Sequence, residues 1–177
     1  MTFPATSPLL VPVVEARGLI PIGSETNSRG GVRQLWVTQE AGELLDGRSD
    51  AYFPVERFAL LVERYLNGYL VRVSIEGDPL SRLPDFELLL TEDEVWVFCS
   101  RSPKSHQYRF FGRFTAQGEF VILFGRSRKS LENGGYAAAI QEFKDQWFAL
   151  FGNHDCLKAT TVDEYLGGVA RNVYEEE

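Results

Sequence analysis

The chain has 177 residues, a length that suits one globular domain spanning residues 1–177. Hydrophobic residues make up 44% of it and aromatic residues 13%, values that predict a packed core and exclude a disordered protein. The net charge of −7 argues against nonspecific binding to nucleic acid or to anionic membranes.

Membrane and secreted proteins are disfavoured as well. No apolar run approaches the ~18 residues needed to span a bilayer, and no Lys or Arg precedes Arg17, where a secretory signal would carry positive charge. Cys99 and Cys156 have no CxxC partners, which is typical of reduced thiols. We therefore expect a cytoplasmic protein that has no membrane partner.

Residues 1–31 are expected to form an extended or loop-rich segment. Pro4, Pro8 and Pro12 interrupt a short apolar stretch, and proline cannot donate a hydrogen bond to a β-ladder. The elements expected next are a short strand over residues 32–37 and a helical turn within residues 39–47.

The clearest helix covers residues 54–66. Its apolar side chains recur at helical spacing on one face, and Asn67-Gly68 provides a C-terminal stop. The apolar face consists of Val55, Phe58, Ala59, Val62, Tyr65 and Leu66. Strands are expected over residues 69–75 and 86–90.

The stretch 94–125 predicts a three-stranded meander. Short connections force its neighbouring strands, residues 95–99, 108–115 and 119–125, to run antiparallel. A second helix over residues 136–151 carries an apolar stripe. The last features are a capping box that opens a short helix, Thr161 to Glu164, and a tail expected to fray, residues 168–177.

This grouping of strands, rather than their alternation with helices, favours an α+β domain. We expect a largely antiparallel sheet of about five strands that includes the three-stranded meander 94–125. The sheet is expected to pack against helices 54–66 and 136–151.

Positive charge is concentrated in one part of this acidic chain. Residues 101–129 hold seven basic residues and one acidic residue, Glu119. In the strand 108–115, one face carries aromatic residues typical of a core, whereas the other alternates cations with an aromatic ring. Such a face can hold a phosphate and stack a base.

The sequence therefore predicts a site for an anionic ligand on the meander. Because the loop before residue 108 and the segment after residue 125 lie at the same end of a meander, their cations are expected to meet. The candidate ligand-binding residues are His106, Arg109, Phe111, Arg113, Arg126, Arg128 and Lys129. Alternatively, these cations pair with carboxylates of the same chain or keep an edge strand soluble.

Other chemistry has little support in the sequence. His154, Asp155 and Cys156 adjoin one another, but a Cys–His pair needs hydrogen-bond geometry and an orienting third group. The two histidines lie 48 positions apart without a zinc-ligand pattern, and no phosphate-loop or dinucleotide motif is present. We predict no catalytic residue, no metal site and no cofactor.

The pattern YRFFGRFTAQGEFVILFGRSRKS, residues 108–130, resembles the end of the RelE/ParE-type toxin fold. There, a strand that begins with Tyr-Arg is followed by a turn, a hydrophobic strand and a basic pair. The resemblance makes Arg109 and Lys129 the matching positions. It implies a basic sheet that cleaves RNA or binds a host target.

We favour a non-enzymatic binding or interaction protein over an enzyme. Its expected partner is an anion, either an acidic protein surface or nucleic-acid phosphate. An exposed aromatic patch would mark a protein partner or a homo-oligomer interface. The alternative is a small RNase-like toxin that uses the same cations, with His106 or Tyr108 as acid or base.

Overall fold

The computed structural model describes residues 17–23, 33–75, 84–153, 156–167 and 170–172. The strands are β1 Ile20–Pro21, β2 Gln34–Val37, β3 Val71–Ser74, β4 Phe86–Leu90, β5 Val95–Cys99, β6 Tyr108–Ala116, β7 Glu119–Ser127 and β8 Ala170–Asn172. The helices are α2 Gln39–Leu45, α3 Val55–Leu66, α4 Arg128–Leu131, α5 Gly135–Phe151 and α6 Val162–Leu166. Of the expected extended or loop-rich segment 1–31, residues 1–16 and 24–31 lie outside the described residues.

The described strands form one mixed sheet in the order β1-β2-β7-β6-β5-β4-β3-β8. The α+β class is confirmed. The sheet has more strands than the expected five or so, and it pairs some of them in parallel rather than being largely antiparallel. The pairs β2–β7, β3–β4 and β3–β8 are parallel. Sequence grouping missed them because each joins strands that are brought together by a long connection rather than a turn.

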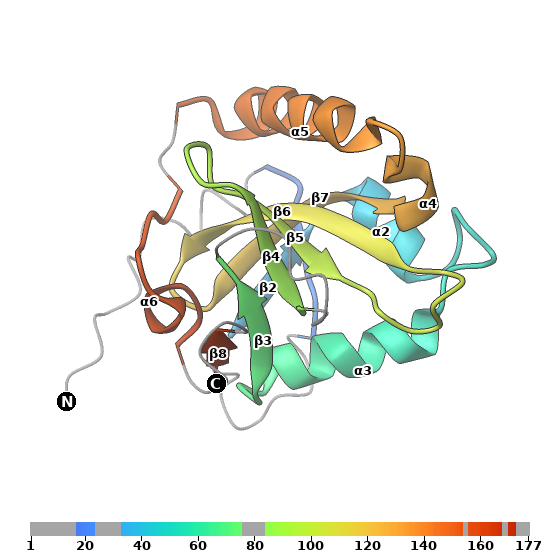
Figure 1. Ribbon diagram of the computed structural model, residues 1–177, viewed down its shortest axis with the longest axis horizontal. Coiled ribbons are helices and arrows are strands. Elements are labelled where there is room, and N and C mark those ends of the chain that lie inside the picture. The colour runs from blue at the N-terminus through green and yellow to red at the C-terminus, as the bar shows by residue number, and fades with distance from the viewer. Residues whose placement is uncertain (1–16, 24–32, 76–83, 154–155, 168–169, 173–177) are drawn as a thin grey trace.

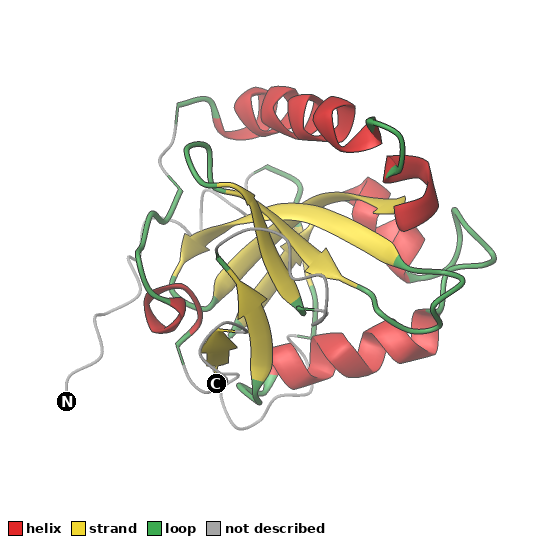
Figure 2. Ribbon diagram, in the orientation of Figure 1, coloured by secondary structure: helices red, strands yellow, loops and turns green. Residues whose placement is uncertain are grey.

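Helices cover both faces of this sheet, as Figures 1 and 2 show, with α5 on one side and α3 on the other. Strand residues point alternately to the two faces, so they divide into two hydrophobic clusters. Phe110 and Phe114 face the α3 side, where α2 and α6 also pack. Phe111 and Phe124 face α5. The sheet is therefore buried on both sides.

Helix α3 matches the predicted helix 54–66 except at its start. Pro54 takes the N-cap position, so the helix begins at Val55. The buried members of its apolar stripe are Phe58, Val62, Tyr65 and Leu66. Its polar face, which carries Arg57 and Arg64, is exposed.

The meander is confirmed. Strands β5, β6 and β7 are consecutive antiparallel neighbours, with Val97 opposite Phe111 and Phe111 opposite Phe124. Gly112 is required where β6 and β7 approach closely, because a Cβ there would lie 2.3 Å from the Val121 carbonyl oxygen. The β6–β7 register shifts between Phe111 and Gly112, beside this close approach.

Two features at the C-terminal end of the chain differ from what the sequence predicted. Helix α5 extends to Gly135 and packs over the β6 face that carries Arg109 and Arg113. Part of the tail expected to fray forms β8 and pairs with β3. The capping box at Thr161 and Glu164 is confirmed.

Candidate functional site

Three of the predicted ligand-binding residues lie beneath α5. Phe111 is fully buried and Arg109 is 5% exposed. The guanidinium carbon of Arg113 lies 5.2 Å from the ring centre of Phe143 and 4.9 Å from that of Trp147. The face that sequence alternation presented as an open cationic surface is therefore an interior layer between β6 and α5.

This interior tolerates the two arginines because each finds partners suited to a flat cation. Arg109 donates from Nη1 to the carbonyl oxygen of Tyr108 at 3.2 Å. Arg113 stacks on the aromatic rings of α5, an arrangement that a guanidinium makes more readily than an ammonium group. The Nε atoms of both have no hydrogen-bond partner among the described residues. Both cations therefore take part in the contacts between β6 and α5.

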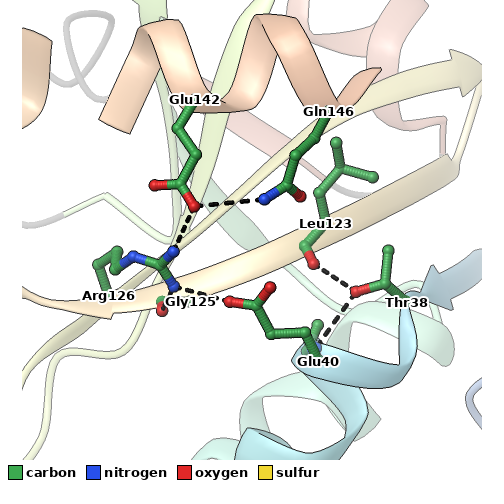
Figure 3. A network of polar contacts seen from close by, with 8 residues as sticks. Thr38, Glu40, Leu123, Gly125, Arg126, Glu142 and Gln146 are labelled. Atoms are coloured by element: carbon green, nitrogen blue, oxygen red, sulfur yellow. Dashed lines mark hydrogen bonds and ion pairs between the residues drawn. The ribbon is translucent and has the colours of Figure 1, made fainter. Parts of the chain in front are cut away.

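Arg126 is neutralised by carboxylates of the same chain, as Figure 3 shows. Its Nη1 lies 2.8 Å from Glu40 Oε1 of α2, and its Nη2 lies 2.5 Å from Glu142 Oε1 of α5. The guanidinium also lies over the ring of Phe124 at 4.3 Å. Arg126 thus links α2, β7 and α5, and the pairing alternative derived from the sequence holds at this position.

The remaining predicted residues, His106, Arg128 and Lys129, do come together. They line one hollow of about 570 Å³ with Lys104, which was not among the predicted ligand-binding residues. His106 and Lys104 belong to the loop after β5, and Arg128 and Lys129 to the start of α4. We call this site the basic hollow. It is lined by Asp50, Tyr52, Lys104, Ser105, His106, Gln107, Tyr108, Ser127, Arg128, Lys129 and Glu132.

Neutral groups hold part of the basic hollow in place. Arg128 donates from Nη1 to Gln107 Oε1 at 2.8 Å. Neither Lys104 nor Lys129 lies within ion-pair distance of a carboxylate in the described part of the chain. Their charges therefore remain available to a ligand.

Two stacked aromatic rings line part of the basic hollow. The rings of Tyr52 and His106 stack with centres 5.9 Å apart and planes 18° apart. Tyr52 is 76% exposed, so one face of its ring is open to a further planar group. Tyr52 was not predicted as a site residue, because no pattern near it in the sequence distinguishes it from a loop aromatic.

Tyr108 and Asp50, which both line the same hollow, form a hydrogen-bonded pair. The hydrogen bond from the Tyr108 hydroxyl lowers the pKa of the Asp50 carboxyl, and the Tyr52 backbone N–H adds to the effect. Burial, reinforced by Asp50, raises the pKa of Tyr108. Tyr108 is therefore a protonated donor at neutral pH and not a ready general base.

A second cationic hollow was not predicted. Its arginines are Arg57 and Arg64 from α3, Arg72 from β3 and Arg101 from the loop after β5. We call this hollow, of about 450 Å³, the arginine pocket. Arg57 and Arg64 are seven positions apart and so share a helix face, which was the one local signal in the sequence.

Cys99 is buried and Cys156 is partly buried. Burial raises the pKa of Cys99 to about 12 and that of Cys156 above its usual range, so both thiols stay protonated. His154 and Asp155 lie outside the described residues. Over the described ranges, no group of three or more His, Cys, Asp or Glu side chains is placed to hold a metal ion.

Comparison of the chain with protein-family models, with curated protein sequences and with solved structures found no match. Within the described ranges, no helix has the length and apolar character needed to cross a membrane.

Proposed function

We propose that this chain is a non-enzymatic binding protein whose basic hollow takes an anionic partner. The observation that carries the proposal is the convergence of Lys104, His106, Arg128 and Lys129 on one hollow. Arg109, Phe111, Arg113 and Arg126 support the surrounding architecture. The candidate ligand-contacting set is thus smaller than the sequence-predicted set and shifted toward the loop end of the meander.

Among anionic partners, a single-stranded nucleic acid fits the hollow better than an acidic protein surface. Lysine and arginine supply contacts for phosphates, and the open face of Tyr52 supplies a platform for an unpaired base. The acidic remainder of the chain repels a long polyanion. We therefore expect binding to be confined to a short strand and to weaken steeply with salt.

RNA cleavage is the second candidate. His106 favours it, because its ring lines the hollow beside three cations and its Nδ1 lies 2.8 Å from Ser105 Oγ. Of the two positions matched by the toxin resemblance, Lys129 lines the hollow whereas Arg109 is buried. Tyr108 is a poorer acid–base candidate because its hydroxyl is bound to Asp50.

A titration of short fluorescent single-stranded RNA, followed by anisotropy, tests the proposal. Replacing both lysines, Lys104→Gln and Lys129→Gln, should weaken binding about tenfold or more, as expected for two lost charged contacts. Arg48→Gln is the matched control, since Arg48 is an exposed arginine outside the lining of the hollow. Equal affinities for the wild type and the double variant would refute the site.

The same samples separate the remaining alternatives. Shortening of the RNA on a denaturing gel, lost in His106→Ala, would identify cleavage instead of binding alone. Binding of a labelled acidic peptide that competitor RNA does not displace would point to a protein partner. Cleavage would replace the proposed function, whereas peptide binding would keep the anion site and change the class of partner.

Location and assembly are part of the proposal. The free thiols Cys99 and Cys156 support a cytoplasmic protein. Phe148 on α5 is 62% exposed, which supports a protein partner or a second copy of the chain at that helix.

A further inference from the structure

The arginine pocket is separate from the basic hollow. The two hollows share no lining residue. Gln107, which lines the basic hollow, forms hydrogen bonds with one residue of each. Gln107 Nε2 donates to the Arg101 carbonyl oxygen at 3.0 Å, and Gln107 Oε1 accepts from Arg128 at 2.8 Å. An anion in the arginine pocket would therefore meet a different set of side chains.

One buried carboxylate organises this pocket. Asp85, 1% exposed, accepts a hydrogen bond from Arg101 Nη2 at Oδ1 and one from the Arg72 backbone N–H at Oδ2, the latter at 2.9 Å. Both carboxylate oxygens are thereby occupied. Asp85 balances the charge of Arg101 and fixes its guanidinium at the wall of the pocket.

The other three arginines of the pocket are not paired with any carboxylate of the described residues. Arg57 donates to Ser102 Oγ at 3.3 Å, and Arg64 donates to the Leu70 carbonyl oxygen at 2.9 Å, both uncharged acceptors. No carboxylate of the described residues lies within ion-pair distance of Arg57, Arg64 or Arg72. Several guanidinium groups around one hollow repel one another, and a bound anion would remove that repulsion.

The chemistry of the walls narrows the class of ligand. A guanidinium presents its N–H donors in an arrangement that matches the oxygens of a phosphate. Three guanidinium groups that have no carboxylate partner among the described residues suit a dianion better than a single carboxylate. Phe58, Leu61 and Leu70 add an apolar wall. A phosphate group attached to a small apolar body would contact both kinds of surface.

We infer that the arginine pocket binds a small phosphate monoester, with the phosphate held by Arg57, Arg64 and Arg72 and the organic part against the apolar wall. Asp85 and Arg101 are positioning residues in this site. The inference does not depend on the basic hollow or on the function proposed for it.

Isothermal titration calorimetry with phenyl phosphate, inorganic phosphate and benzoate tests this inference at fixed ionic strength. Phenyl phosphate should bind more tightly than inorganic phosphate, which lacks the apolar body, and more tightly than benzoate, which lacks the second charge. The double variant Arg57→Gln, Arg64→Gln should bind phenyl phosphate at least about tenfold more weakly. Both arginines are exposed on α3, so the variant should melt no lower than the wild type in the absence of ligand.

Lys129→Gln is the matched control, because it removes one positive charge from the basic hollow and leaves the arginine pocket intact. It should bind phenyl phosphate as the wild type does. Loss of binding in this control but not in the double variant would place the phosphate in the basic hollow and overturn the inference, while leaving the proposed function standing. No binding to the wild type, or equal binding by the wild type and the double variant, would also overturn it.

Discussion

Replacing Arg33 with methionine should destabilise the fold far more than the loss of an exposed positive charge would. Arg33 is 2% exposed and lies between the C-terminal ends of α3 and α6. Among the described residues, its guanidinium donates to carbonyl oxygens of four. These are Tyr65 at 3.4 Å, Tyr69 at 3.2 Å, Leu166 at 3.1 Å and Gly167 at 2.7 Å.

The magnitude follows from these contacts. Methionine approximates the length of the arginine stem but leaves the carbonyl oxygens at two helix ends without this donor. Hydrogen bonds to a charged group contribute ~1.5–3 kcal/mol each and are not additive. The desolvation that lowers the pKa of Arg33 offsets part of the gain in the wild type. We expect the Arg33→Met variant to lose about 3 kcal/mol of unfolding free energy.

Urea unfolding followed by tryptophan fluorescence measures this loss, since the chain has three Trp residues. The midpoint should fall with little change in the slope, as expected for an unchanged native surface. Arg48→Met is the control, because Arg48 forms an exposed ion pair with Asp46 and should change stability by less than ~0.5 kcal/mol. A loss of less than ~1 kcal/mol in Arg33→Met would mean that these carbonyl contacts contribute little to the fold.

Three further predictions concern the sheet. Arg113→Met should change the unfolding free energy by less than ~1 kcal/mol, because the stacking lost on α5 is offset by removal of a buried Nε that has no hydrogen-bond partner among the described residues. The variant should also leave RNA affinity unchanged in the anisotropy assay. Burial raises the pKa of Glu119 above its usual value, so its ionised form costs stability at neutral pH, and the wild type should gain stability as the pH falls from 7 through that raised pKa. In urea titrations, Glu119→Gln should be about 1 kcal/mol more stable than the wild type at pH 7, and this difference should vanish below the unfolded pKa. Gly112→Ala should lose more than ~2 kcal/mol by the same measurement, because its Cβ would lie 2.3 Å from the Val121 carbonyl oxygen. Loss of RNA binding by Arg113→Met, no pH-dependent difference for Glu119→Gln, or a neutral Gly112→Ala would each contradict the corresponding prediction.

The helices and the meander were predictable because their signals are local. The 3.6-residue period of α3 and α5 and the short turns between β5, β6 and β7 lie within single windows of sequence. The parallel positions of β2 and β8 depend on distant partners, to which no local period responds.

The sequence pattern of β6 did not indicate that its charged face lies under α5, and the reason is physical. Strand alternation separates two faces correctly, and charged residues usually mark the one open to solvent. Here the guanidinium of Arg113 stacks on aromatic rings of α5. The face of β6 that carries the cations is therefore covered by this helix. The unbroken apolar runs of β5 and β7 were the available signal that the sheet is covered on both sides.

The two hollows also differ in how far the sequence could predict them. The basic hollow was partly predictable, because its cations flank a meander whose ends must meet. The arginine pocket combines residues of α3, β3 and the loop after β5, which only the tertiary structure brings together. Neither Asp85 nor Arg72 carries a sequence pattern that distinguishes it from a surface charge.

The salt dependence of RNA binding is the sharpest test of an anion site in the basic hollow. For single strands, the logarithm of the binding constant falls with the logarithm of salt concentration by about 0.7 for each phosphate contact. The double variant Lys104→Gln, Lys129→Gln should therefore show a slope smaller than that of the wild type by about 1.4. An unchanged slope, or binding by the wild type that does not respond to salt, would contradict such a site.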